Sequence, residues 1–167
     1  EFTDESVTLN GQVIETKDYY LNSSKVNEQD FWSSKYNESP SPRWNLDEPH
    51  PELKSILPQL KLTKRRILVL GCGFGHDAAY LAQQGHLVTG IDISPEAINA
   101  AKEKYSNING LNFELCDIFN LDSKHHQQLD IIFEHTLYCA ISPNKRKELI
   151  KVWKRCLAET GHILGIF

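Results

Sequence analysis

The sequence predicts an α/β fold built on a doubly wound, parallel sheet. From Arg66 onward, short apolar runs alternate with helical patterns, which is the order of βαβ units. The first run, residues 67–70, is continuously apolar, as expected of a strand buried on both faces. A turn with three glycines, residues 71–75, leads from this strand into a helical pattern, which is typical of the ligand-binding end of such sheets.

Length and composition narrow the classes of protein. The 167 residues suit one domain, and 40% of them are hydrophobic and 24% charged, as in ordinary globular proteins. No apolar run approaches the roughly 20 residues that span a bilayer, so we expect no membrane partner. The net charge of -4 disfavours nucleic acid as a partner, because phosphate contacts need clustered Lys and Arg and the basic patch at 64–66 is short.

The cysteines and histidines predict neither disulfides nor a metal site. The cysteines lie far apart without a Cys-x-x-Cys pair, and no secretory signal opens the sequence, which favours reduced thiols in the cytoplasm. No pattern pairs Cys72, Cys116 or Cys139 with a base, so we interpret these three as small buried side chains. His125 and His126 lack the further ligands that a metal site needs. The cysteines are Cys72, Cys116, Cys139 and Cys156.

The amino-terminal part divides into an arm and a lid segment. Asn10-Gly11 stands between two β-prone runs, so residues 1–26 form either a hairpin or an extended polar arm. The lid segment, residues 27–60, holds two helical patterns at 27–36 and 51–59. The prolines between them predict a connecting loop.

The remaining elements follow in alternating order. Gly85 ends a helix that begins at His76, and Ser94 and Pro95 suit the N-cap and the first position of the next helix. A long amphipathic helix is expected at residues 144–158. The further strands are expected at residues 87–91, 111–115, 129–133 and 162–167.

The ends of the first two strands predict an adenosine site. Glycines at Gly71, Gly73 and Gly75 let a ligand approach the backbone closely, and the helix that follows offers free N–H groups. A plain strand-to-helix turn is the alternative. Asp92 ends the second strand, 21 positions after Gly71, where a carboxylate accepts both hydroxyls of an adenosine ribose. The other interpretation of Asp92 is a loop acid or an N-cap.

Asp77 distinguishes two classes of adenosine ligand. It replaces the third small residue of the dinucleotide fingerprint, and its charge would repel a pyrophosphate. The same carboxylate can pair with the ammonium group of S-adenosylmethionine or face its sulfonium. The sequence therefore favours S-adenosylmethionine, with S-adenosylhomocysteine as the product, over a nicotinamide cofactor.

More site candidates follow the third and fourth strands. Asp117 can accept a hydrogen bond from the adenine amino group while Ile118 and Phe119 cover the ring, although an ordinary turn acid fits the same pattern. Glu134 and His135 stand at the tip of the fourth strand, where sulfur and acceptor should meet. A surface histidine is the alternative for His135.

Four segments together resemble the thiopurine S-methyltransferase superfamily, and most closely its thiol and halide methyltransferase branch. They are residues 69–77, 90–94, 116–119 and 130–146. The resemblance covers about residue 29 to the end. It implies the Rossmann-like sheet of the class I S-adenosylmethionine-dependent methyltransferases.

The resemblance also implies which residues surround the cofactor. Cys72 and Ile93 would lie beside it, and an aromatic trio, Trp32, Tyr36 and Trp44, would close over it. Tyr36 stands where the family usually has tryptophan. Aromatic faces attract a sulfonium and exclude water. The alternative is that these rings only pack the amino-terminal helix on the core.

Methyl transfer from a sulfonium needs alignment and a dry pocket more than a strong base. For a thiol acceptor a nearby cation would assist deprotonation, and Arg146 resembles the family arginine that faces the substrate. A solvated charge at a helix start is the other interpretation of Arg146. Tyr138 and His135 are further candidates for touching the acceptor.

We therefore expect transfer of a methyl group to a small-molecule acceptor, which is a thiol, a thiopurine or a halide. The alternatives are an O-, N- or carboxyl methyltransferase and a non-catalytic S-adenosylmethionine-binding domain. The domain is expected to comprise residues 27–167, including the lid segment.

The family normally continues through two more strands and another helix. The sheet is therefore expected to be truncated after its fifth strand, whose exposed edge would invite pairing with another chain. Cofactor binding relies on the first four strands, so we expect it to survive this loss better than turnover does.

Overall fold

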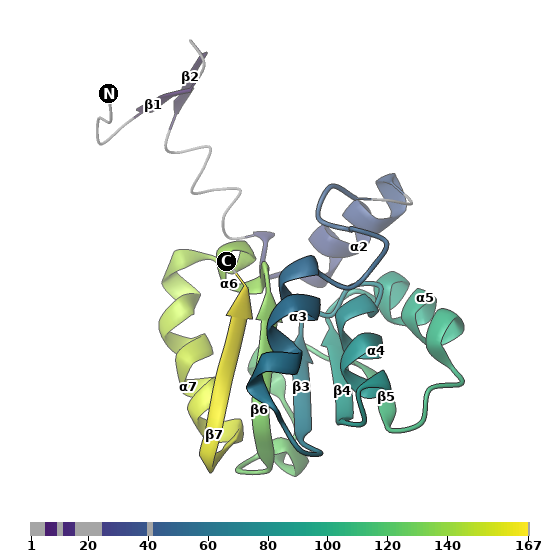
Figure 1. The fold of residues 1–167 in the computed structure, drawn as a ribbon. Coiled ribbons are helices and arrows are strands. Elements are labelled where there is room, and N and C mark those ends of the chain that lie inside the picture. The colour runs from purple at the N-terminus through teal and green to yellow at the C-terminus, as the bar shows by residue number, and fades with distance from the viewer. Residues whose placement is uncertain (1–5, 10–11, 16–24, 40–41, 167) are drawn as a thin grey trace.

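A five-stranded parallel sheet forms the centre of the protein in the computed structural model, which describes residues 6–9, 12–15, 25–39 and 42–166. The strand order is β5-β4-β3-β6-β7, so β3 is central and the chain winds outward on both sides of it (Figure 1). This order is the doubly wound arrangement that the sequence predicts. The strands are β3 (Arg66–Leu70), β4 (Leu87–Asp92), β5 (Leu111–Leu115), β6 (Leu129–His135) and β7 (Leu157–Ile166).

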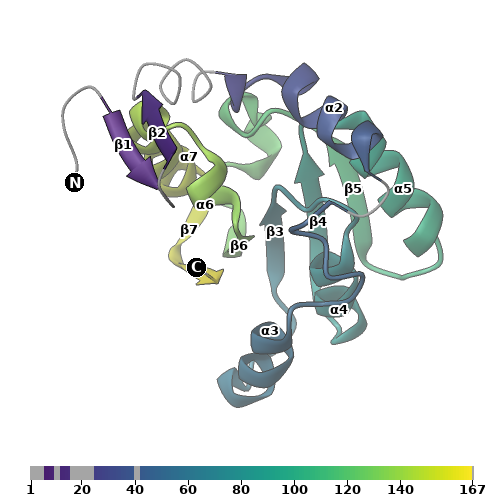
Figure 2. The ribbon, with the colours of Figure 1, turned by 90° about the horizontal axis from the view of Figure 1, so that it is seen from above.

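Helices cover both faces of the sheet (Figure 2). The predicted N-cap Ser94 accepts a hydrogen bond from the Ala97 amide at the start of α5, at 3.3 Å. The α-helices are α2 (Gln29–Glu38), α3 (Pro51–Ile56), α4 (His76–Gln83), α5 (Pro95–Tyr105), α6 (Leu137–Ala140) and α7 (Arg146–Cys156). Short 3-10 helices are η1 (Leu57–Leu60), η2 (Ile118–Asn120), η3 (Ser123–His125) and η4 (Pro143–Lys145).

The alternation of side chains along β3 divides the core into two layers. Ile67 and Val69 pack with residues of α3, α4 and α5 on one face. Leu68 and Leu70 pack with residues of α7 and η2 on the other. Because both faces are covered, all four of these side chains are buried, which explains the continuous apolar run in the sequence.

The amino-terminal arm contains an antiparallel pair, β1 (Ser6–Leu9) and β2 (Gln12–Glu15). These two strands are the β-prone runs on either side of Asn10-Gly11 in the sequence. The Asn-Gly turn itself lies outside the described residues. No helix in the described part of the chain is long and apolar enough to cross a membrane.

The carboxyl-terminal strand differs from the prediction at its start. β7 begins at Leu157, directly after α7, whereas the sequence predicted a helix to residue 158 and a strand from 162. Leu157 pairs with Leu129 and His162 with Ile131, so β7 contains extra residues in a bulge opposite a two-residue step of β6. Residues 143–145 form η4, so α7 starts at Arg146 and not at residue 144. α6 was not predicted.

Gly90 of β4 lies so close to Phe113 that a larger residue at position 90 should destabilise the fold. A Cβ atom at Gly90 would lie 2.8 Å from Cδ1 of Phe113 and 3.0 Å from Sγ of Cys72. Gly90→Ala should therefore lower the free energy of unfolding, measured by urea denaturation, by about 1–3 kcal/mol. Phe113→Leu removes the clashing ring edge, so the double variant should lose less stability than the two single losses together. Additive losses would contradict this account.

Candidate functional site

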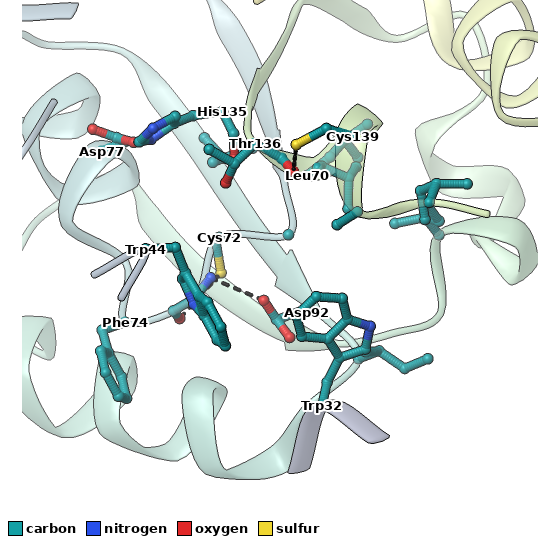
Figure 3. Close-up of a pocket in the computed structure, with 18 of the residues that line it drawn as sticks. Trp32, Trp44, Leu70, Cys72, Phe74, Asp77, Asp92, His135, Thr136 and Cys139 are labelled. Carbon is teal, nitrogen blue, oxygen red and sulfur yellow. Dashed lines mark hydrogen bonds and ion pairs between the residues drawn. The ribbon is translucent and has the colours of Figure 1, made fainter. Parts of the chain in front are cut away.

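A cavity of about 400 Å³ opens at the carboxyl ends of the central strands. Its volume falls in the range of roughly 300–1,000 Å³ that is usual for small-molecule sites. The end of β3 and the loop after it form the floor, and the ends of β4 and β6 form opposite sides. Residues of α2 and the loop that follows it complete the wall. Figure 3 shows Asp92 and Trp32 toward one end of this cavity and Asp77 and His135 toward the other.

Asp92 is the most buried acid on the cavity wall, with 6% of its surface exposed. Its Oδ2 accepts a hydrogen bond from the Gly73 amide at 2.9 Å, and its Oδ1 accepts one from the Ser94 amide at 2.9 Å. Burial raises the pKa of Asp92, and these backbone hydrogen bonds oppose the rise. Each carboxylate oxygen can accept a further bond, so the group is held in place and still able to bind hydroxyls.

Only part of the glycine loop lines the cavity. Gly71, Cys72 and Gly73 line it, as the sequence predicts. Gly75 does not, because it is the N-cap of α4 at φ +81° and faces the core, where a Cβ would lie 2.6 Å from Cζ of Phe113. Its role is close packing of helix and sheet and not contact with a ligand.

Aromatic rings from the lid segment cover the glycine loop. The rings of Trp32 and Trp44 meet edge to face with centroids 5.6 Å apart. The centroid of the Tyr36 ring lies 5.9 Å from that of Trp44 and 5.1 Å from that of Phe74. Burial, with a smaller effect of the nearby Asp92 charge, raises the pKa of Tyr36. Its hydroxyl therefore stays protonated and can donate a hydrogen bond next to Gly73.

A buried histidine fixes the loop that carries Trp44. Nε2 of His76 lies 3.1 Å from Oδ1 of Asn45, and Nδ1 lies 2.6 Å from the hydroxyl of Tyr105. Burial lowers the pKa of His76, so its ring is neutral at physiological pH. The contacts tie the lid segment to α4 and α5, which gives the aromatic cluster a fixed position.

The turn after β5 forms the wall beyond Asp92. Asp117, Ile118 and Phe119 all line the cavity, together with Ile93 after β4. Asp117 caps η2, because its Oδ1 accepts from the Phe119 amide at 2.9 Å and its Oδ2 from the side chain of Asn120 at 3.0 Å. Asp117 thus lies on the cavity wall and also acts as the acid that caps its own turn.

Asp77 and His135 also line the cavity and contact each other. Oδ2 of Asp77 lies 3.2 Å from Nδ1 of His135, and Oδ1 accepts a hydrogen bond from the His50 amide at 2.7 Å. The side chains of Asp77 and His135 are only 16% and 18% exposed. His135 is therefore a paired residue of the site wall and not a solvated surface histidine.

Besides Gly75, three predicted site residues lie outside the cavity lining, namely Glu134, Tyr138 and Arg146. Glu134 is fully buried, and its Oε2 accepts a hydrogen bond from the Tyr138 amide at 3.0 Å, so it supports the turn into α6. Burial raises the pKa of Glu134. The guanidinium of Arg146 lies 4.8 Å from the ring centroid of Tyr138, and its Nε donates to the Ile141 carbonyl at 3.3 Å. Arg146 and Tyr138 therefore pack on each other and do not face this cavity.

The sequence did not single out the residues that follow β6 on the cavity wall. Thr136 adopts a left-handed φ of 63°, and the turn it forms brings α6 against the glycine loop. This conformation is uncommon for a threonine, and no glycine or asparagine marks it in the sequence. The lining residues contributed by this turn and α6 are Thr136, Leu137, Cys139, Ala140 and Ile141.

The charges on the wall are all negative. Glu48, Asp77, Asp92 and Asp117 line the cavity, and within the described ranges no lysine or arginine does. Most of the remaining lining is apolar or aromatic. In the described part of the chain, no group of three or more His, Cys, Asp or Glu side chains is close enough together to hold a metal ion.

The chain matches the family model of thiopurine S-methyltransferase over residues 27–167. A probable thiol methyltransferase 2 of Arabidopsis thaliana is 26% identical over 154 residues, which are 90% of this chain and 67% of that protein. Thiocyanate methyltransferase 1 of the same organism is 29% identical over 145 residues, or 85% and 63% of the two chains. A 2-heptyl-1-hydroxyquinolin-4(1H)-one methyltransferase of Mycobacteroides abscessus is 34% identical over 121 residues, or 67% and 52%. The chain thus spans between about half and two thirds of these relatives.

Solved structures show the same fold. A protein from work on the conversion of a disulfide bond into a thioacetal group during echinomycin biosynthesis aligns with a TM-score of 0.70 and 27% identity, over 77% of this chain and 54% of that one. The 1,6-didemethyltoxoflavin-N1-methyltransferase of Burkholderia thailandensis, solved with S-adenosylhomocysteine, aligns with a TM-score of 0.67 and 20% identity, over 96% and 67%.

These matches confirm the predicted fold class and the family resemblance. The sheet order, the glycine loop and the acid at the end of β4 agree with the Rossmann-like sheet of class I methyltransferases. The family match begins at residue 27 and includes the whole cavity wall apart from Val26. The chain therefore belongs to the thiopurine S-methyltransferase family, a family of S-adenosylmethionine-dependent methyltransferases.

Proposed function

We propose that this protein binds S-adenosylmethionine and transfers its methyl group to a small-molecule acceptor. The observation that carries the proposal is the position of Asp92. It stands at the end of β4, hydrogen-bonded to the glycine loop, inside an apolar cavity at the point where the winding of the sheet reverses. A carboxylate held there accepts ribose hydroxyls, and the apolar wall suits the adenine ring.

The residues present fit this cofactor. Asp92 would hold the ribose, while Asp117, Ile118 and Phe119 would surround the adenine from the turn after β5. The glycine loop would receive the amino-acid part of the molecule. The cofactor supplies an electrophilic methyl group on a sulfonium when bound, and the lid aromatics exclude water from that group and face its positive charge.

The acceptor class rests on the family. The relatives carry the names of thiol and thiocyanate methyltransferases, which supports transfer to a sulfur atom, and the family resemblance adds halides as acceptors. The hydroxyquinolinone methyltransferase among the relatives supports a heteroaromatic acceptor as the second candidate. In both cases the acceptor would enter beside His135, at the end of the cavity away from Asp92 (Figure 3).

The remaining expectations extend this proposal. Residues 27–167 would act as the cofactor-binding domain, with the lid segment included, and residues 1–26 as a separate arm. In the described sheet β7 pairs only with β6. A partner of small-molecule size and not nucleic acid fits the acidic cavity, and the free cysteines fit a cytoplasmic setting.

Asp92→Asn tests the cofactor site. Isothermal titration of the wild-type protein with S-adenosylmethionine should give saturable one-site binding. The variant should bind about 10- to 100-fold more weakly, because it loses charge-assisted hydrogen bonds to the ribose. Asp122→Asn removes the same charge from an exposed turn outside the cavity and should leave the affinity unchanged. Equal affinities of wild-type protein and Asp92→Asn would contradict the assignment.

The pH dependence of binding follows from the same group. Burial raises the pKa of Asp92, so the carboxyl takes up a proton at a higher pH than an exposed aspartate does. Ribose hydroxyls donate to the charged form. The affinity for S-adenosylhomocysteine should be highest above the raised pKa and should fall as the pH drops through it, in titrations that run from neutral pH down toward the ordinary aspartate value of about 3.9. The ratio of wild-type to Asp92→Asn affinity should decline over this range, and a constant ratio would refute the explanation.

A further inference from the structure

A histidine–carboxylate pair stands where the acceptor would enter the cavity. His135 ends β6, and Asp77 lies in the first turn of α4, 58 positions earlier in the sequence. The pair is partly buried, and both residues belong to the cavity wall. The cofactor-binding role proposed for Asp92 does not use either of them.

The surroundings fix the orientation of the His135 ring. Asp77 is held by the His50 amide through Oδ1, and its Oδ2 faces Nδ1 of His135. The ring of His50 packs edge to face on the ring of His135, with centroids 4.3 Å apart. A carboxylate on Nδ1 favours the tautomer with the proton on that nitrogen, which makes Nε2 a proton acceptor. Among the described residues, no hydrogen bond is recorded for Nε2.

The charges around the cavity oppose an acceptor that is already an anion. Asp77, His50 and the neighbouring Glu134 are the titratable groups that face or adjoin His135, and Glu48 lies on the same wall. Arg146, the cation expected to meet the substrate, packs on Tyr138 instead. A neutral acceptor can enter this acidic cavity without electrostatic repulsion, and it must then lose its proton inside.

We propose that His135, oriented by Asp77, is the general base of the reaction, and that the acceptors are neutral protic molecules, above all thiols, in preference to halide or thiocyanate anions. The inference rests on the proposed methyltransferase function. Nε2 of His135 takes the proton of the S–H group, and the sulfur lone pair forms the new S–C bond. The old C–S bond breaks with its electron pair passing to the sulfonium sulfur, which becomes a neutral thioether. Asp77 stabilises the imidazolium until the proton passes to water.

Steady-state kinetics with two kinds of acceptor test the proposal. With S-adenosylmethionine saturating, kcat/KM for 2-mercaptoethanol should exceed that for iodide and for thiocyanate. His135→Gln should lower kcat/KM for the thiol by about 10²- to 10⁴-fold, and the loss for iodide should be far smaller, since iodide has no proton to lose. Asp77→Asn should lower kcat for the thiol with a smaller effect on KM. The wild-type rate should reach its plateau below the pH at which the free thiol ionises, whereas the His135→Gln rate should follow the thiolate concentration.

Two controls separate a chemical role of the pair from a structural one. His125→Gln makes the same substitution in a histidine–carboxylate pair with Glu114, which lies outside this cavity, and should not change the ratio of thiol to iodide activity. Long-range ¹H–¹⁵N NMR spectra should show His135 in the Nδ1–H tautomer when neutral, and Asp77→Asn should abolish that preference. This readout requires no turnover.

The outcomes distinguish the inference from the function on which it rests. Transfer to iodide or thiocyanate in preference to thiols, or equal losses for both kinds of acceptor in His135→Gln, would overturn the inference and leave the methyltransferase function in place. A neutral His135 in the Nε2–H tautomer would overturn it as well. Failure of the wild-type protein to bind S-adenosylmethionine or to methylate any acceptor would overturn the proposed function and this inference together.

Discussion

The site depends on the position of β3 between two parallel neighbours. β4 lies on one side of it and β6 on the other, and the connections to them run over opposite faces of the sheet. The loops after β4 and β6 therefore diverge from β3 and leave a space above its carboxyl end. The glycine loop lies below this space, and because Gly71 and Gly73 have no side chains, a ligand can reach the backbone. Asp92 and His135 are brought to opposite sides of the same opening by strand pairing alone.

The charged side chains that line the cavity are all acidic, which makes its electrostatic potential negative. A carboxylate as buried as Asp92 is normally costly, and here backbone amides of Gly73 and Ser94 compensate part of that cost. The other acids of the wall leave the cavity negative, which complements a sulfonium ligand. The acids differ in their partners. Asp117 bonds within its own turn, Asp92 bonds both to its own turn and to the glycine loop, and Asp77 bonds to His135 at the end of β6. The Asp77–His135 pair joins two segments that lie 58 positions apart in the sequence.

The lid segment shows how a short stretch with few buried residues is held over a site. α2 has no fully buried residue. It is held by the aromatic contacts of Trp32 and Tyr36 with Trp44 and Phe74, and by a hydrogen bond from Asn37 to Glu96 of α5 at 3.3 Å. His76 links the Trp44 loop to the body of the fold. The aromatic contacts and the His76 hydrogen bonds therefore hold the lid segment over the cavity although α2 has no buried residue.

The sequence by itself determined the doubly wound sheet, the start of α5 and the position of Asp92 beside the glycine loop. These features follow from local rules: buried parallel strands are continuously apolar, Ser94 and Pro95 begin a helix, and an acid after β4 lies near the glycine loop whatever the rest of the chain does. Tertiary structure decided the end of the cavity opposite Asp92. The pairing of Asp77 with His135, the stacking of Arg146 on Tyr138 and the bulge in β7 join segments whose relative placement depends on strand register and helix packing. No local propensity encodes such contacts, because side chains far apart in sequence meet only after the sheet has fixed their separation and direction.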